Sequence, residues 1–335
     1  SQAYYSVEEA ESSLYPTLDV EGNINRQYNY VGNIDGTNNS YTMTVIARQL
    51  IFDGGSTREA IKSQRAIYGA ALEETSLQRR NIINEVIDNY LNIVTLQKNQ
   101  ISNSILIEAL QDINNKIALM LEAGGASQAK LDFANSRLSF SKTLLTQTVS
   151  ALNDAVSNVE ALTGQLPPFV ATYPTMVQLA DYSLEEYIDI AREYNNELQV
   201  NRLNVQAIDH QLEAERGTYL PTIDFQVEGQ QANDEGGIDV DQTREGRALL
   251  RARYSIFDGG LRDATINRVR SQLTEFNVQG DLLEQDLIRD IKKSYNQAAS
   301  IRQSLQITQE EIQSNLSLQK LNRENFELGD IDIIE

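Results

Sequence analysis

The hydrophobic positions of residues 56–122 recur at steps of three and four, and this segment contains no proline. This spacing places the apolar side chains on one side of an α-helix. At about 1.5 Å per residue, such a helix would be roughly 100 Å long, which is far longer than helices of ordinary globular domains. Residues 261–328 show the same pattern. We therefore predict two long helices, at about 55–122 and 261–328, that pack as coiled coils.

Two further segments have helical character. Residues 128–162 show the same spacing, and this segment ends shortly before Gly164 and a pair of prolines. Residues 183–216 begin at a serine that is closely followed by two glutamates, a common helix start. We predict one helix in each segment, joined by a connector at 165–182.

Apolar and polar residues alternate in four other segments, at about 17–30, 41–52, 222–232 and 246–257. A period of two predicts β-strands with one apolar and one polar face. Each alternating stretch has about 10–12 residues, the length of a tilted strand that crosses a membrane. The segments between them are rich in Gly, Asn and Asp and predict two hairpin loops. The expected loops are 31–40 and 233–245.

Aromatic residues are concentrated near the ends of these strands. Outer-membrane barrels carry aromatic side chains in two bands, one at each membrane surface. A soluble sheet with one wet face would show the same alternation, but the aromatic positions and the strand lengths favour the membrane. The residues are Tyr28, Tyr30 and Tyr41 near the first loop, and Tyr15, Phe52, Tyr219 and Phe257 at the opposite strand ends.

The chain also contains an internal repeat with an offset of 205 residues, as from Thr17 to Thr222. The sequence Phe-Asp-Gly-Gly follows the second strand of each hairpin, starting at Phe52 and at Phe257. A repeat in one register predicts two structural copies that need neighbours to bury their faces. Because each copy lacks segments that the other has, we expect the chain to be truncated at both ends. The predicted copies are 1–164 and 183–335.

The duplicated order of these motifs resembles the TolC-like outer-membrane efflux proteins. In both copies Pro-Thr-x-Asp leads into a strand, the return strand ends in Phe-Asp-Gly-Gly, and a very long helix runs to a glycine-containing tip. The resemblance covers essentially the whole chain. It implies a mixed α/β membrane protein that forms a homotrimer. Each protomer would give four strands to one transmembrane β-barrel, which continues into a long α-helical coiled-coil barrel, the periplasmic tunnel.

This resemblance implies a function as well. The protein would be a passive exit duct in the outer membrane of a Gram-negative bacterium, serving tripartite efflux or type I secretion. Its partners would be a periplasmic adaptor (a membrane fusion protein), an inner-membrane transporter and outer-membrane lipid. The alternative is a soluble periplasmic coiled-coil scaffold or adaptor with a non-membrane β-sheet. The sequence does not choose between drug efflux and protein secretion.

The resemblance also places two candidate sites at the periplasmic tips. Acidic residues near the C-terminus would form a gate, because a ring of carboxylates contributed by three protomers attracts cations. Two of these acids also suit a helix N-terminus, where acids are favoured. The gate residues are Asp330, Asp332 and Glu335, and the adaptor-contact residues are Gly124, Gly125, Ala126, Gly329 and Asp330.

Three arginines are predicted on the polar face of the strands, where they would line the barrel lumen: Arg48, Arg251 and Arg253. Ion pairs with acids on neighbouring strands are a simpler role for them than a selectivity ring. Asp53 and Asp258 begin the helices that follow each Phe-Asp-Gly-Gly, where an N-cap is needed. We prefer this structural role of the motif to a phosphate-binding loop.

Composition narrows the function further. The formal charge of −20 disfavours nucleic acid, whose phosphates such a chain would repel. No stretch approaches the roughly 18 apolar residues of a transmembrane helix, so a membrane-spanning role would fall to the strands. With one histidine and no cysteine, the sequence shows no catalytic or metal-binding pattern. We predict that the protein is not an enzyme and needs no cofactor or metal.

Overall fold

The computed structural model describes residues 2–31, 34–168, 171–173, 182–234 and 241–328. The chain forms two compact units. Unit 1 contains residues 1–76 and 189–289, and unit 2 contains residues 77–188 and 290–335. Each unit therefore combines segments of both predicted copies, so the compact units do not coincide with the sequence repeat.

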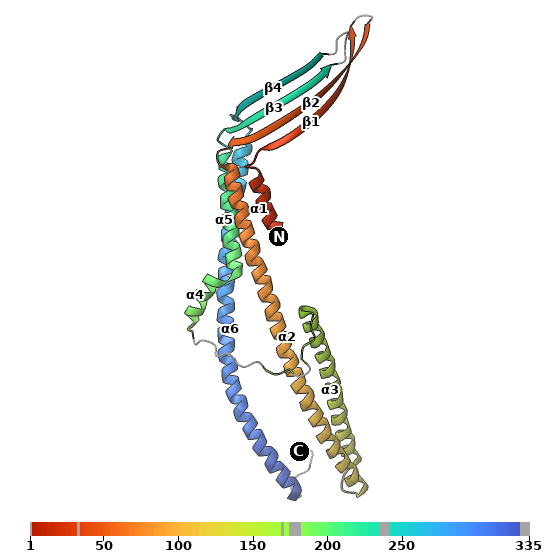
Figure 1. The fold of residues 1–335 in the computed structure, drawn as a ribbon. Helices are drawn as coiled ribbons and strands as arrows, with labels where there is room; N and C mark the ends of the chain where they lie inside the picture. The colour runs from red at the N-terminus through yellow and green to blue at the C-terminus, as the bar shows by residue number, and fades with distance from the viewer. Residues whose placement is uncertain (1, 32–33, 169–170, 174–181, 235–240, 329–335) are drawn as a thin grey trace. The chain divides into compact units, whose positions relative to one another are not determined.

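Unit 1 contains a sheet of four antiparallel strands in chain order, β1-β2-β3-β4, which lie side by side and are visibly curved (Figure 1). The predicted strand 246–257 is wrong at its end, because residues 254–257 have no strand partner in the described chain and are not strand. At the hairpin loops the strands are longer than the sequence predicts, and the described residues of the expected loops 31–40 and 233–245 are strand. For example, Ser40 of β2 pairs with Asn25 on one side and with Asp234 on the other. Pairing on both sides outweighs the low strand propensity of these residues. The strands are β1 (Thr17–Val31), β2 (Ile34–Phe52), β3 (Thr222–Asp234) and β4 (Asp241–Arg253).

The two hairpins have the same register. Thr17 pairs with Arg48 in the first hairpin, and Thr222 pairs with Arg253 in the second. Both members of each pair are related by the shift of 205 residues that relates the sequences, as from Thr17 to Thr222. Equivalent residues therefore occupy equivalent positions on the two halves of the sheet.

The helices of unit 1 pack through a narrow apolar core. Leu212 of α5 contacts Ile266 and Val269 of α6, and all three side chains are buried. The hydroxyl of Ser63 donates a hydrogen bond of 2.8 Å to the backbone carbonyl of Ala207, which joins α2 to α5. The helix α1, which the sequence pattern does not predict, precedes the sheet. The helices are α1 (Gln2–Ser12), α5 (Asn196–Gly217), and the N-terminal parts of α2 (Ser56–Glu122) and α6 (Leu261–Leu328).

The single helix predicted at 183–216 is wrong, because the structure contains two helices there. These are α4 (Leu184–Tyr194) and α5, and they are separated at Asn195. Asn195 adopts an extended conformation, with φ −73° and ψ 120°, and its side chain accepts a hydrogen bond from the backbone N–H of Leu198. Asparagine is a strong N-cap, so it ends one helix and begins the next within a continuous helical pattern.

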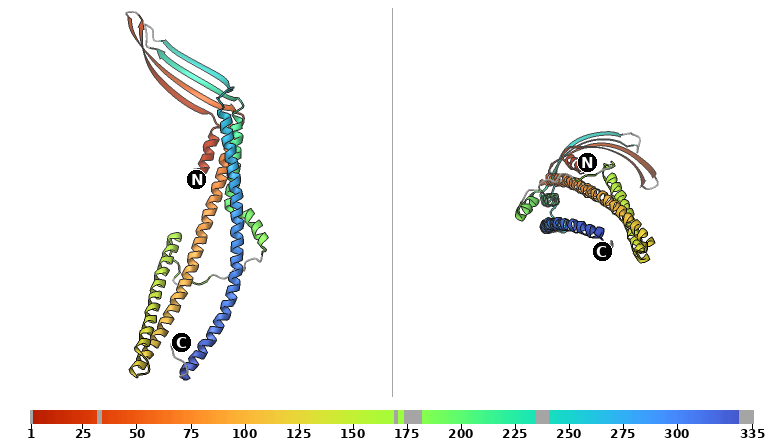
Figure 2. Two further views of the ribbon diagram at one scale, coloured as in Figure 1. Left: turned by 180° about the vertical axis from the view of Figure 1, so that it is seen from behind. Right: turned by 90° about the horizontal axis from the view of Figure 1, so that it is seen from below.

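Unit 2 is built on the C-terminal part of α2 and on α3 (Gln128–Thr163), which lie side by side (Figure 2). Their core contains Ile93 and Val94 of α2 together with Ala155 and Val159 of α3. Ala171 of the connector completes this cluster, and its backbone N–H donates to the side chain of Gln97 at 2.9 Å. In the described part of the chain, no helix has an 18-residue stretch apolar enough to cross a lipid bilayer.

Candidate functional sites: sheet faces, junctions and helical tip

One face of the sheet is apolar across all four strands. Residues directly opposite each other in a ladder lie on the same face. Val20 pairs with Val45, and Val227 pairs with Ala47 on one side and Ala248 on the other. The large side chains of this face are exposed: Leu18 by 71%, Ile24 by 79% and Leu250 by 72%. Contiguous apolar surface of this kind marks contact with another protein or with lipid.

The opposite face is polar, and its centre is buried. Along β3, Gln226 is 2% exposed and Glu228 is 9% exposed. The residues that alternate with them on the apolar face, Phe225 and Val227, are 41% and 43% exposed. A soluble sheet with one wet face has the opposite pattern, with apolar residues buried and polar residues in water. The sheet is therefore inverted with respect to a soluble one.

The three predicted lumen arginines, Arg48, Arg251 and Arg253, lie on this polar face, but the expected ion pairs do not form within the described part of this chain. In the described part of the sheet, Glu228 forms its ion pair with Arg247, while these three form none. The register accounts for Glu228, which lies opposite Arg247, and for Arg48, which lies opposite neutral residues on both sides. Arg251 lies opposite Asp224 but forms no ion pair in the described part of the sheet.

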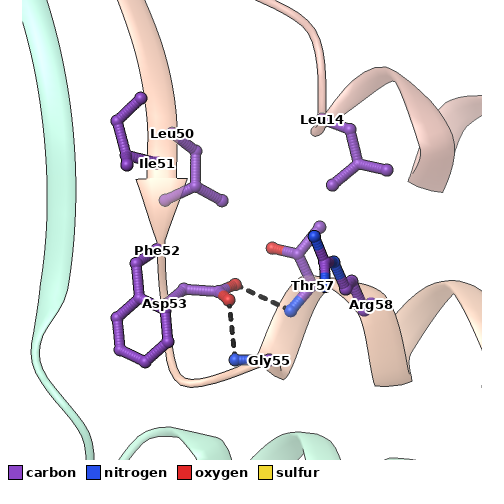
Figure 3. Close-up of a pocket in the computed structure, with 8 residues that line it drawn as sticks. All are labelled: Leu14, Leu50, Ile51, Phe52, Asp53, Gly55, Thr57 and Arg58. Carbon is purple, nitrogen blue, oxygen red and sulfur yellow. Dashed lines mark hydrogen bonds between the residues drawn. The ribbon is translucent and has the colours of Figure 1, made fainter.

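The turn from β2 into α2 is closed by Asp53 (Figure 3). Its carboxylate accepts hydrogen bonds from the backbone N–H of Gly55 at 3.0 Å and of Thr57 at 2.7 Å. The carboxylate therefore caps the start of the helix as predicted, although α2 begins three residues later, at Ser56. Since the carboxylate occupies the N–H groups that a phosphate would need, the turn does not suit an anion. A hollow of about 380 Å³ adjoins it, lined by Leu14, Leu50, Ile51, Phe52, Asp53, Gly55, Thr57 and Arg58.

The equivalent turn before α6 has the same cap and an added arginine. The carboxylate of Asp258 accepts from the backbone N–H groups of Gly260 and Arg262, at 3.0 and 3.2 Å, and from Arg262 Nε at 2.6 Å. The hydrogen bond from the Arg262 side chain is the main reason that the pKa of Asp258 is lowered. Arg262 also donates to the carbonyl of Ser255 and lies over the ring of Tyr219. It therefore links α6 to both ends of the second hairpin.

His210, the single histidine, is expected from its acidic helix to be exposed, and this is wrong. Its Nδ1 lies 2.8 Å from Oε2 of Glu59, and its side chain is 23% exposed. The packing of α5 against α2 covers this face of the helix. Hydrogen bonds from Lys62 and His210 lower the pKa of Glu59, although burial acts in the opposite direction.

At the predicted adaptor-contact tip, α2 ends in a Schellman motif. Gly124 has a left-handed φ of 77°, which favours glycine. Its N–H bonds to the carbonyl of Leu121, and the N–H of Gly125 bonds to that of Met120, at 3.0 and 2.8 Å. The two glycines are exposed and Ala126 is half-buried. The other predicted tip and gate residues, Gly329, Asp330, Asp332 and Glu335, lie outside the described residues.

Residues 1–165 and 187–335 match the family described as outer membrane efflux protein. The chain belongs to this family. Membership places the protein in the outer membrane of a Gram-negative bacterium and in a family of efflux channels rather than enzymes.

Two curated relatives illustrate the range of this family. The chain is 22% identical over 308 residues to the outer membrane efflux protein BepC of Brucella suis biovar 1 (strain 1330). The matched region covers 88% of this chain and 64% of BepC. It is 20% identical over 189 residues to the proteases secretion protein PrtF of Dickeya chrysanthemi. The matched region covers 54% of this chain and 41% of PrtF. The chain therefore spans less than two thirds of the length of either relative.

The fold of this outer membrane efflux protein is similar to that of CusC, whose structures are described in terms of folding and transmembrane channel formation. The TM-score is 0.87 at 15% identity, over 99% of this chain and 78% of CusC. At this identity the similarity concerns the fold: a mostly helical chain with one four-stranded sheet.

Proposed function

We propose that the protein is one protomer of a trimeric outer-membrane exit duct, with its apolar sheet face in lipid and its polar face towards a lumen. The inverted burial of the sheet carries this proposal. Exposed Leu18, Ile24 and Leu250 suit a hydrocarbon environment, and buried Gln226 and Glu228 suit a polar interior. A soluble scaffold would have to leave this apolar surface in water.

The proposed trimer follows from the sheet edges. In the described part of the chain, β1 and β4 each have a neighbouring strand on one side only. Within a bilayer an unpaired strand edge leaves backbone groups without hydrogen bonds, at a cost of several kcal/mol each. Four strands are too few to close a barrel, so further copies of the hairpins are needed. Three protomers, each a twofold repeat at the offset that relates Thr17 to Thr222, would close it, and their long helices would form the periplasmic coiled-coil tunnel.

Neighbouring residues on the two faces test this arrangement. Ile24 is apolar and 79% exposed, and Asn25 is exposed on the polar face. We expect Ile24→Arg to reduce the yield of protein in the outer membrane, because an arginine facing lipid costs about 2–4 kcal/mol at mid-membrane. Asn25→Arg, which adds the same charge to the polar face, is the matched control and should be inserted normally. Equal yields of the two variants, in a protein that is soluble without detergent, would support the periplasmic scaffold instead.

The remaining sites belong to this proposal. The exposed Gly124-Gly125 tip and the Gly329-Asp330 segment would contact a periplasmic adaptor that connects the duct to an inner-membrane transporter. Asp330, Asp332 and Glu335 would form the gate. Replacing all three by their amides should lower the preference for cations over anions in single-channel recordings. An unchanged ion selectivity would show that these three acids do not form the gate.

The cargo belongs to one of two classes. BepC is described as an efflux protein and PrtF as a secretion protein for proteases. The acidic mouth favours small cationic compounds, which is our first proposal. Loss of the protein should then increase sensitivity to such compounds, whereas a loss of secreted protein without that sensitivity would favour type I secretion.

A further inference from the structure

The pairing of β2 with β3 inside one chain indicates how the strands of two protomers pair. β2 and β4 are equivalent in the repeat, and so are β1 and β3. The pairing of β2 with β3 within the chain therefore corresponds to a pairing of β4 with β1 of a second copy. We propose that β4 of one protomer pairs with β1 of the next in this register, which places Arg253 opposite Glu21 of the neighbouring copy. This inference rests on the proposed trimer and specifies its seam.

The register follows from the pairs that the structure contains. Arg48 of β2 lies opposite Gln226 of β3. The repeat offset takes Arg48 to Arg253 and takes Gln226 back to Glu21. Two other β2–β3 pairs, Ala47 with Val227 and Val45 with Gly229, are transformed in the same way. They predict Ala252 opposite Gly22 and Leu250 opposite Ile24.

The predicted pairs agree with the faces of both strands. Ile24 and Leu250 are the most exposed of the large apolar residues described in β1 and β4, at 79% and 72%, and they meet on the apolar face. Glu21 and Arg253 meet on the polar face. A shift of one residue would bring each of these side chains opposite one from the other face, so the alternation of both strands restricts the seam to this register or to shifts of two.

Charge complementarity fits the proposed register but does not select it, because a shift of two would place Asp19 opposite Arg253 and Glu21 opposite Arg251. The choice of register rests on the β2–β3 pairing. On the polar face β1 carries Asp19 and Glu21, and β4 carries Arg251 and Arg253. None of the four forms an ion pair among the described residues. In the proposed register Glu21 is opposite Arg253 and diagonal to Arg251, both within reach of a long side chain. The internal seam has the neutral Gln226 at the position of Glu21, so the ionic contact is particular to the seam between copies.

The end of β4 provides independent support. β2 continues beyond Arg48 to Phe52, and there it pairs with β3 alone. The equivalent continuation of β4, residues 254–257, has no strand partner in the described chain and is not a strand. Its large side chains are exposed, by 60% for Tyr254 and by 86% for both Ile256 and Phe257. Pairing with the β1 strand of a second copy would extend β4 through these residues.

Cysteine cross-linking tests the seam directly, because the chain contains no cysteine of its own. Two double variants place cysteines at predicted opposite positions: Glu21→Cys with Arg253→Cys, and Gly22→Cys with Ala252→Cys. Adjacent rows of an antiparallel ladder alternate between wide and close pairs, so one of the two variants has the spacing that favours a disulfide. Gly22→Cys with Leu250→Cys, shifted by two residues, is the matched control.

We expect oxidation of the membrane-extracted protein to give a covalent trimer with at least one predicted pair, and loss of that product with the shifted pair. A trimer by native mass that cross-links only through the shifted pair would overturn the register and leave the duct intact. Absence of any trimer would overturn the duct as well. In addition, Glu21→Arg should weaken the trimer, and combining it with Arg253→Glu should restore it. If the second change does not restore the trimer, Glu21 and Arg253 do not form an ion pair between copies.

Discussion

At the turn from β2 into α2, two consecutive glycines have different surroundings. Both have a left-handed backbone, with φ of 74° at Gly54 and 86° at Gly55. A Cβ atom on Gly54 would lie 2.2 Å from the carbonyl oxygen of Gly217, whereas one on Gly55 would meet nothing within 4 Å. Gly54 therefore allows the end of α5 to contact the turn, and Gly55 serves the backbone conformation alone.

We expect Gly54→Ala to destabilise the protein more than Gly55→Ala. Both variants lose about 1–2 kcal/mol because alanine disfavours the left-handed region. Only Gly54→Ala adds a backbone clash, which requires α5 or the turn to move. Thermal unfolding of the two variants in the same detergent measures the difference, and equal losses would show that the contact with Gly217 is unimportant.

The ion pair of Asp258 with Arg262 predicts a dependence of stability on pH. Because the pKa of Asp258 is lowered in the folded protein, its charge stabilises the fold fully above its ordinary pKa of about 3.9. This contribution is lost as the pH falls through the lower folded pKa. Asp258→Asn keeps a capping side chain but removes the charge, so it should be less stable than the native protein at pH 7.

The stability gap between the native protein and Asp258→Asn should narrow as the pH is lowered below about 4. Unfolding midpoints measured across this range test the expectation. In an Arg262→Gln background the same Asp258→Asn change should have a smaller effect at neutral pH. A gap that is independent of pH in both backgrounds would contradict the role of the charge.

For single residues, the sequence predicts contacts between residues that are close along the chain. The N-caps Asp53 and Asp258 are foreseeable because each carboxylate bonds to backbone groups two and four residues along the chain. The partner of Glu228 depends on strand register, and the partner of His210 depends on how α5 packs against α2. Neither contact is encoded within a short stretch of sequence, and the expected exposure of His210 is wrong for that reason.

The elements of this fold are long helices with thin apolar stripes, in which single glycines have specific roles. In α6 a Cβ on Gly280 would lie 2.5 Å from Oδ1 of Asn201, whose amide also donates to the carbonyl of Phe276 at 3.2 Å. In α2 a Cβ on Gly69 would meet only the methyl groups of Leu203 at 3.5 Å, an ordinary contact. Gly280 thus brings α5 and α6 together, whereas Gly69 has no such role.

We expect Gly69→Ala and Gly280→Ala to have effects of opposite sign. Alanine is better than glycine in a helix by about 1 kcal/mol, so Gly69→Ala should stabilise the protein by up to that amount. Gly280→Ala gains the same propensity but must displace the buried Asn201 amide, so it should be destabilising. Unfolding measurements on both variants test this, and a stabilised Gly280→Ala would contradict the proposed contact.

Periodicity predicts the long helices well because a stripe of about 67 residues contains many repeats of the signal. It misses the break at Asn195, where one capping residue interrupts a continuous pattern, and it misses α1. The strands are predicted too short at their loop ends because Gly, Asn and Asp suggest loops. These residues form strands because β2 pairs with a neighbouring strand along both edges. Such pairing depends on the whole sheet and cannot be seen in any one segment.

At the scale of the whole molecule, the inverted sheet and its two unpaired edges require an environment that one chain does not provide. In the proposed trimer, lipid outside the apolar face and further copies at β1 and β4 would satisfy both requirements. The tip at Gly124 and the gate at Asp330, Asp332 and Glu335 gain their proposed roles only in that assembly. For this reason the sequence of one chain, even with its repeat recognised, leaves the sites as predictions.

The native mass of the protein extracted from outer membranes in mild detergent shows whether the sheet belongs to a membrane barrel. We expect a trimer that needs detergent to remain in solution. A monomer or dimer that stays soluble without detergent would contradict it. In that case the four strands would be an ordinary sheet and the exit duct would be excluded.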